Sequence, residues 1–171
     1  LYHDNVLAKQ AGCGRTPWHF DDHHFPLDTN DVVTAWAPAQ PIPLEMGPLS
    51  FAYPLDVHKL VNAVTFEKTG TGYDRGVTDV FSKNNVTVNE TPFELGEVSF
   101  HHNLNFHTAS SNRTNRSRVA LANTYYRDGA RIVDSPTMVS GDWQKFVPNV
   151  KPGDLAASPL NPFCLPVKDQ S

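Results

Sequence analysis

A histidine and an aspartate stand two residues apart near the start of the chain, in Trp18-His19-Phe20-Asp21. On a strand, residues i and i+2 point to the same face, so the His19 imidazole and the Asp21 carboxylate can reach one point in space. A second histidine on a neighbouring strand would complete a non-haem Fe(II) site. In such a site two histidines and one carboxylate leave three positions open for a cosubstrate and O₂.

A second histidine cluster supplies the candidates for this third ligand, namely His101, His102 and His107. His107 ends an alternating segment, and Arg118 begins the next one after the polar loop 108–117. If the two strands form a hairpin, Arg118 returns close to His107, where an arginine can make a bidentate contact with a cosubstrate carboxylate. His101 and His102 lie in mid-strand, one on each face, and are interpreted as structural histidines.

Several neighbouring residues have ordinary interpretations. Asp22 faces away from Asp21 on a strand and is not counted as a ligand. His23 and His24 are expected in a loop, where they can line a substrate pocket. Arg116 is the alternative to Arg118, but it lies within the polar loop, whereas Arg118 opens a strand.

The segments that must position these residues have a period of two rather than 3.6, which indicates strands. Fourteen prolines and ten glycines break up any long helix. A short helix is expected near 57–66, followed by a Gly-rich loop that contains Gly70, Gly72 and Gly76. Short strands between turns favour an antiparallel sandwich or barrel. The expected strands are 31–37, 48–53, 96–107 and 118–126.

Composition narrows the function classes. The chain has 171 residues, 39% of them hydrophobic, which suits a single domain over 1–171 with a buried core. A net charge of −4 argues against nucleic acid or an anionic membrane as the partner. No apolar run approaches the roughly 18 residues of a membrane span, and no secretion signal opens the chain, so a cytoplasmic location is expected. Cys13 and Cys164 are interpreted as two free thiols.

Four segments combine into a longer pattern: Thr16-Pro-Trp-His-Phe-Asp21, Ala35-Trp36, Glu45-Met-Gly-Pro-Leu49 and Gly96-Glu-Val-Ser-Phe-His-His-Asn-Leu-Asn-Phe-His107, followed by Asn112 and Arg118. The pattern consists of His-x-Asp, a Trp seventeen residues after the first His, and a distal His with Asn five and Arg eleven residues beyond it. In these features the sequence resembles the phytanoyl-CoA dioxygenase (PhyH) family, which includes the ectoine hydroxylases. The resemblance runs from about Tyr2 to about Tyr126.

The resemblance implies an all-β-dominated fold with few short helices, the double-stranded β-helix or jelly roll, a cupin-like barrel. It implies that His19, Asp21 and His107 bind Fe(II), and that Arg118 pairs with the distal carboxylate of 2-oxoglutarate. It further implies that Trp36 lines the cosubstrate pocket and that Lys9 lies near it. In related halogenases the aspartate is replaced by Ala or Gly, so Asp21 favours hydroxylation.

The sequence departs from the family pattern in three respects. Phe20 stands where members often have Gln, and Ala109 stands where a Ser is common two residues after the distal His. Members are also usually longer at the N-terminus, so an N-terminal portion is expected to be missing. The segment 151–171 holds four prolines and is expected to form an extended C-terminal arm.

The resulting hypothesis is a dioxygenase that uses Fe(II), 2-oxoglutarate and O₂ to hydroxylate a small organic molecule, with release of succinate and CO₂. Two alternatives remain open: a cupin-like metalloenzyme that does not use 2-oxoglutarate, and a non-catalytic metal-binding jelly-roll fragment. Formation of succinate would distinguish the 2-oxoglutarate-dependent dioxygenase from the cupin-like metalloenzyme. Binding of iron without any uptake of O₂ would indicate the non-catalytic fragment. The sequence names neither the substrate nor an oligomeric state.

Overall fold

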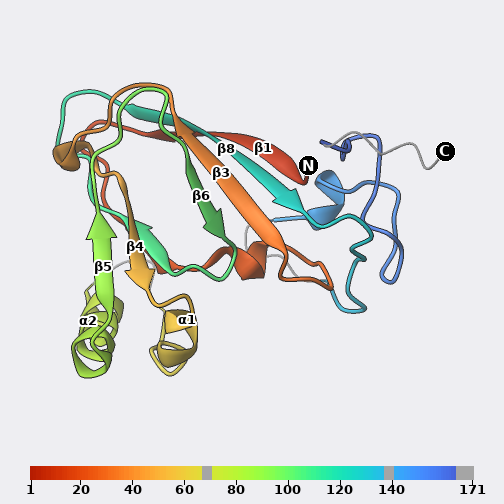
Figure 1. The fold of residues 1–171 in the computed structure, drawn as a ribbon, viewed down its shortest axis with the longest axis horizontal. Helices are drawn as coiled ribbons and strands as arrows, with labels where there is room; N and C mark the ends of the chain where they lie inside the picture. Colours follow the sequence, from red (N-terminus) through yellow and green to blue (C-terminus); the bar gives the residue numbers. More distant parts are fainter. Residues whose placement is uncertain (67–70, 137–140, 165–171) are drawn as a thin grey trace.

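The computed structural model describes residues 1–66, 71–136 and 141–164, and its described part is dominated by β-strands (Figure 1). Two helices and three short 3-10 turns accompany the strands. The helical elements are α1 (Val57–Leu60), α2 (Gly72–Asn84), η1 (Asp21–His24), η2 (Leu44–Met46) and η3 (Trp143–Lys145). The strands are β1 (His3–Lys9), β2 (Thr16–His19), β3 (Val32–Pro38), β4 (Leu49–Tyr53), β5 (Thr87–Glu90), β6 (Ser99–His102), β7 (His107–Ala109) and β8 (Arg118–Tyr126).

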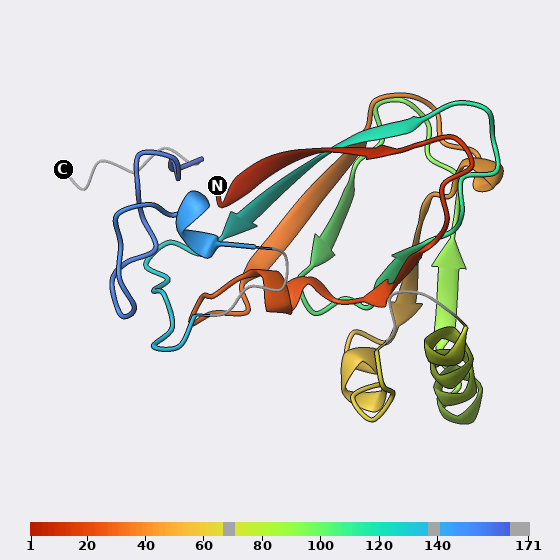
Figure 2. The ribbon, with the colours of Figure 1, turned by 180° about the vertical axis from the view of Figure 1, so that it is seen from behind.

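The strands form two four-stranded antiparallel sheets. The sheet of order β1-β8-β3-β6 is the longer one, and we call it sheet A; the sheet of order β2-β7-β4-β5 is sheet B. The chain crosses repeatedly between the two sheets, as in a jelly roll (Figures 1 and 2). The predicted jelly-roll fold is therefore confirmed, and the strands expected at 31–37, 48–53 and 118–126 correspond to β3, β4 and β8.

The long strand expected over 96–107 is wrong. The chain forms β6, turns through residues 103–106, and continues as β7 in the other sheet. Two buried asparagines make the turn: the backbone N–H of Asn103 donates to Val32 O, and that of Asn105 donates to His102 O. These bonds satisfy backbone groups that a continuous strand would have paired with its neighbours. The change of sheet is what brings His107 opposite sheet A.

The Gly-rich loop expected after the first helix is also wrong where the structure describes it, because Gly72 and Gly76 lie in the thirteen-residue helix α2. Tyr73 and Val77 are buried on one face of α2, and their burial outweighs the poor helix propensity of glycine. A Cβ at Gly76 would lie 2.6 Å from Val64 Cγ1, so the glycine allows close packing. Gly70 lies outside the described residues.

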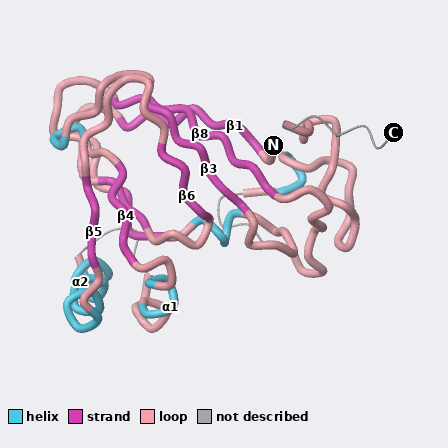
Figure 3. The backbone as a smooth tube through the Cα atoms, in the orientation of Figure 1, coloured by secondary structure: helices cyan, strands magenta, loops and turns pink. Residues whose placement is uncertain are grey.

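The core has three parts. One cluster, which includes Trp36, Leu49 and Ala122, lies between the sheets. A second packs α1 and α2 against sheet B, where both helices lie at the ends of β4 and β5 (Figures 1 and 2). A third joins Tyr2 to the segment after β8, which Figure 3 draws mostly as loop. Within that segment the Asn161 side chain donates to the Tyr2 carbonyl oxygen over 3.2 Å. Of the predicted 151–171 arm, residues 165–171 lie outside the described part.

No helix in the described ranges is long and apolar enough to cross a membrane. Cys13 and Cys164 are both exposed free thiols.

Candidate metal centre and cosubstrate pocket

A cavity of about 300 Å³ lies between the two sheets. Sheet B lines it with His19 of β2 and His107 of β7, and Asp21 enters from the turn η1. Sheet A lines it with inward-facing residues of β1, β3, β6 and β8, among them Trp36 and Arg118. The cavity therefore collects five of the six residues that the sequence singles out for the site.

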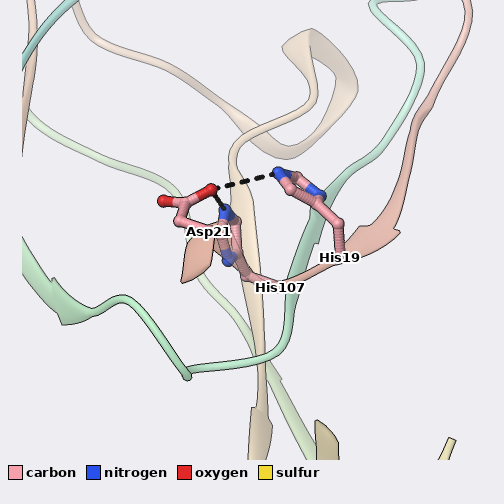
Figure 4. A group of neighbouring side chains, drawn as sticks. All are labelled: His19, Asp21 and His107. Carbon is pink, nitrogen blue, oxygen red and sulfur yellow. Dashed lines mark ion pairs between the residues drawn. The ribbon is translucent and has the colours of Figure 1, made fainter. Parts of the chain in front are cut away.

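The three predicted metal ligands converge at one point (Figure 4). One ligand atom from each of His19, Asp21 and His107 lies within 4.8 Å of the others. The Nε2 atoms of His19 and His107 lie 3.6 Å and 3.9 Å from the same carboxylate oxygen, Asp21 Oδ1. This spacing suits a divalent ion that all three side chains would share, with open positions toward the cavity.

Backbone hydrogen bonds hold both imidazoles in the tautomer that a metal requires. The Nδ1 atom of His19 lies 2.8 Å from Pro17 O, and that of His107 lies 2.9 Å from Asn105 O. A carbonyl oxygen only accepts, so each Nδ1 carries the proton and each Nε2 has a free lone pair. Metal-binding histidines commonly use their second nitrogen in this way. The donor set therefore fits Fe(II).

The electrostatics keep the site in its metal-binding protonation state. Burial, reinforced by the nearby His19, lowers the pKa of His107 to about 3, so this imidazole is neutral at pH 7. Burial alone would raise the pKa of Asp21, but the neighbouring imidazoles of His107 and His101 outweigh it and hold that pKa below its usual range. A neutral histidine and an ionised carboxylate are the forms that coordinate a cation.

The local structure around Asp21 differs from the expectation that it shares a strand with His19. Strand β2 ends at His19, and Asp21 begins η1 with its backbone N–H donating to Asn103 O over 2.7 Å. Asp22 points elsewhere and accepts a 2.9 Å bond from the Asn103 side chain. The two candidate ligands His19 and Asp21 thus meet because Asn103 anchors the turn, not because of strand alternation.

Arg118 lies at another part of the cavity wall and is 5% exposed. Its guanidinium stands 5.4 Å above the centre of the Trp36 ring, and its Nη1 donates to the carbonyl oxygen of Gly47. Gly47 has φ +74°, and a side chain there would clash with the Ser110 carbonyl. Within the described residues, Arg118 Nε is buried without a hydrogen-bond partner. A ligand carboxylate in the cavity would supply one.

Lys9 is placed directly opposite Arg118 in the pairing of β1 with β8. Its ammonium group donates to Thr16 Oγ1 over 3.2 Å and to Ala109 O over 3.3 Å, and Lys9 is not among the residues that line the cavity. Burial, with the nearby Arg118, lowers the pKa of Lys9 to about 8. In the described ranges no carboxylate lies within ion-pair distance of either cation, so this corner of the barrel favours an anion.

The hairpin that was expected to bring Arg118 back to His107 is wrong. Strands β7 and β8 belong to different sheets, and the two residues face the same cavity from opposite walls. The intervening loop is organised by buried Asn112, whose amide donates to the carbonyl oxygens of Lys9, Gln10 and Arg116. Asn112 thereby fixes the point at which β8 begins.

We expect Asn112→Ala to lower the free energy of unfolding by about 2–3 kcal/mol, because several buried backbone groups lose their partner. Urea unfolding followed by circular dichroism measures the change. Asn115→Ala, an exposed asparagine of the same loop, is the matched control. A loss below about 0.5 kcal/mol, the usual range for surface substitutions, would show that Asn112 does not organise the loop.

His101 is the site residue whose position the sequence interpretation missed. It was interpreted as a structural histidine, yet its Nε2 lies 3.8 Å from Asp21 Oδ2 and it lines the cavity. The signal was its place in the strand: His101 pairs with Thr34 of β3, and both side chains face inward. Phe20 departs from the family pattern and packs on Phe106 and His58, outside the cavity lining.

Solved structures with the same fold include two enzymes of nogalamycin biosynthesis. The non-heme alpha ketoglutarate dependent carbocyclase SnoK is 23% identical, with a TM-score of 0.69, over 92% of this chain and 58% of SnoK. The epimerase SnoN, in complex with Fe3+, alpha ketoglutarate and nogalamycin RO, is 21% identical, with a TM-score of 0.64, over 94% of this chain and 62% of SnoN. The chain thus spans about three fifths of the length of these neighbours.

At the level of sequence, no curated protein matches the chain significantly. The family profile described as "Phytanoyl-CoA dioxygenase (PhyH)" matches residues 1–120, more than two thirds of the chain. This range contains all six predicted site residues and confirms the resemblance found in the sequence. The chain belongs to the phytanoyl-CoA dioxygenase family.

Proposed function

We propose that this protein is an Fe(II)- and 2-oxoglutarate-dependent dioxygenase that hydroxylates a small organic molecule. The observation that carries this proposal is the convergence of two metal-ready imidazoles and one carboxylate on a cavity that also contains the buried, incompletely hydrogen-bonded Arg118. Membership of the family supports the reaction class. The iron and alpha ketoglutarate named for the SnoN complex support the cofactors.

The protein's part in this chemistry is to bind and orient. His19, Asp21 and His107 would hold Fe(II) at the edge of the cavity and would leave it accessible to the other reactants from that side. Bound Fe(II), together with 2-oxoglutarate and O₂, supplies the oxidising power for attack on a C–H bond, with succinate and CO₂ as coproducts. The apolar side chains in the cavity lining, among them Phe25, Trp36 and Leu49, would limit the access of water to the reacting atoms.

Arg118 orients the cosubstrate. Its free Nε–H and its planar guanidinium suit the distal carboxylate of 2-oxoglutarate, whose keto-acid end would be directed to the metal. Trp36 fixes the guanidinium by stacking beneath it and forms one wall of the pocket. Lys9 adds a second positive charge behind Thr16 and Ala109, so its role is to favour the anion electrostatically rather than to touch it.

The substrate would occupy the end of the cavity that lies away from Arg118. Thr124 is six residues further along β8, about 20 Å at the usual rise per residue. There His3, Thr124 and Thr34 form a cross-strand row of polar side chains on the inner face of sheet A. Such a row favours a substrate with hydroxyl or carbonyl groups. SnoK and SnoN are named as a carbocyclase and an epimerase, so hydroxylation is the outcome that needs testing.

The first experiment is an anaerobic titration of the purified apoprotein with Fe(II) and then with 2-oxoglutarate. A weak absorption band near about 500 nm that requires both additions is the expected result, because the keto acid chelates a facial-triad Fe(II). With O₂ and a panel of hydroxylated small molecules, succinate is then expected together with a product heavier by one oxygen atom. Formation of succinate together with a cyclised or epimerised product would support the assignment of Fe(II) and 2-oxoglutarate but would exclude hydroxylation as the reaction.

A second candidate is a cupin-like metalloenzyme that does not use 2-oxoglutarate. Ala109, which lines the cavity where the family commonly has a serine, is the observation that favours it. This reading predicts iron binding with no band on addition of 2-oxoglutarate and no succinate. The same titration therefore decides between the two.

A further inference from the structure

The two carboxylate oxygens of Asp21 have different neighbours. His19 and His107 both face Oδ1, while His101 faces Oδ2 with its Nε2 at 3.8 Å. The structure therefore distinguishes an oxygen that faces the two metal-binding imidazoles from an oxygen that faces a fourth imidazole. This difference between Oδ1 and Oδ2 arises from the positions of the protein's own side chains.

The His101 ring is held in place by packing. It is 6% exposed, and its centre lies 5.4 Å from that of Phe51 and 5.0 Å from that of His107. Its Nδ1 is buried and has no hydrogen-bond partner among the described residues. Asp21 is thus the polar group toward which the ring is directed. A buried imidazole with one unpaired nitrogen is unfavourable, and such exceptions to full hydrogen bonding occur mainly at functional sites.

We propose that His101 is a positioning residue, whose Nε2–H faces Asp21 Oδ2 at 3.8 Å, attracts it electrostatically and so restricts Asp21 to coordination through Oδ1. Chelation by both oxygens would use one of the three positions that a facial triad leaves open. With Oδ2 engaged by His101, that position remains free for the keto acid. Hydrogen bonds to the non-coordinating atoms of metal ligands commonly orient those ligands. The inference rests on the proposed metal site but not on the identity of the substrate.

The test measures binding of Co(II), an air-stable probe, to the whole 171-residue chain and to four variants: His101→Leu, His101→Gln, His102→Gln and, as a reference for the loss of a ligand, His107→Gln. His101→Leu removes the donor, and we expect it to weaken Co(II) binding by roughly 10- to 100-fold, the usual effect of losing such a partner. It should also weaken 2-oxoglutarate binding to the Co(II) form, because Asp21 is then free to chelate. His101→Gln keeps an N–H donor and should recover most of both losses.

His102→Gln is the matched control, because His102 is the next residue and its Nδ1 accepts a bond from the Leu104 N–H, away from Asp21. It should bind Co(II) and 2-oxoglutarate as the unchanged chain does. Circular dichroism checks that each variant is folded. If His101→Leu does not fold, His101→Met, which fills a similar volume without a donor, takes its place in the comparison with His101→Gln.

Two results would overturn the inference. One is Co(II) affinity within twofold of the unchanged chain in the variant without a donor. The other is His101→Gln binding as poorly as His107→Gln, which would make His101 a ligand rather than a positioning residue. Failure of the proposed function is distinguishable from either, since it would appear in the unchanged chain as metal binding without any response to 2-oxoglutarate.

Discussion

Asp21→Ala should abolish measurable hydroxylation, with a loss of roughly 10³-fold or more in succinate formation. Loss of an outer partner of a metal ligand already costs about 10- to 100-fold, and Asp21 would itself be a ligand. It is also the carboxylate that both His19 and His107 face at less than 4 Å. Without it, the two imidazoles alone would hold the ion weakly. Fe(II) titration and succinate assays on the same preparation measure the two effects.

Asp22→Asn is the control for this variant. Asp22 is adjacent, is partly exposed, and accepts a hydrogen bond from the Asn103 side chain that an asparagine can also accept. Its metal affinity and turnover should stay within about twofold of the unchanged chain, as expected for a substitution away from the site. Unchanged turnover in Asp21→Ala would show that the metal centre lies elsewhere.

Arg118→Met should raise the 2-oxoglutarate concentration needed for half-maximal turnover by about 10- to 100-fold, with a smaller effect on the maximal rate. The estimate corresponds to losing charge-assisted hydrogen bonds of about 1.5–3 kcal/mol, at 1.4 kcal/mol per factor of ten. Methionine roughly preserves the volume that packs over Trp36. The 2-oxoglutarate requirement of Arg118→Lys should lie between those of the unchanged chain and Arg118→Met, because lysine retains the charge but not the bidentate geometry. Steady-state kinetics with varied 2-oxoglutarate measure the change.

Arg116→Ala serves as the matched comparison, since Arg116 is exposed in the loop before β8 and is the arginine that the sequence offers as the alternative. It should leave the 2-oxoglutarate requirement unchanged. If the 2-oxoglutarate requirement rose in Arg116→Ala but stayed normal in Arg118→Met, Arg116 rather than Arg118 would be the residue that binds the cosubstrate.

Much of the site could be predicted because its signals are local or familiar. His19-x-Asp21 is a short motif, and the spacing from His107 to Arg118 carries the family resemblance. Strand β8 could be located to the residue, because a run of mainly apolar, β-branched and aromatic residues lies between a polar loop and Arg127. Family membership confirms what these patterns indicated about the class of protein.

What could not be predicted depends on long-range contacts. The break after His102 is decided by backbone bonds from Asn103 and Asn105, and alternation alone continues straight through it. Helix α2 forms despite its glycines because Val64 and the face of sheet B provide a surface for it to cover. The role of His101 depends on which side of β6 meets Asp21, and the sequence leaves both sides of that strand with a histidine.

The pairing of β1 with β8 has a consequence for how the protein is made. Strand β1 is synthesised before the other described strands but pairs along its whole length with β8, which is made more than a hundred residues later. The wall that sheet A gives to the cavity is therefore incomplete until β8 has been made, and contacts of such long range also slow folding. The three candidate metal ligands all precede β8 in the chain, whereas Arg118 opens it. Arg118 is therefore the last of the six predicted site residues to be synthesised, and it takes its place in the cavity wall only when the two distant strands have paired.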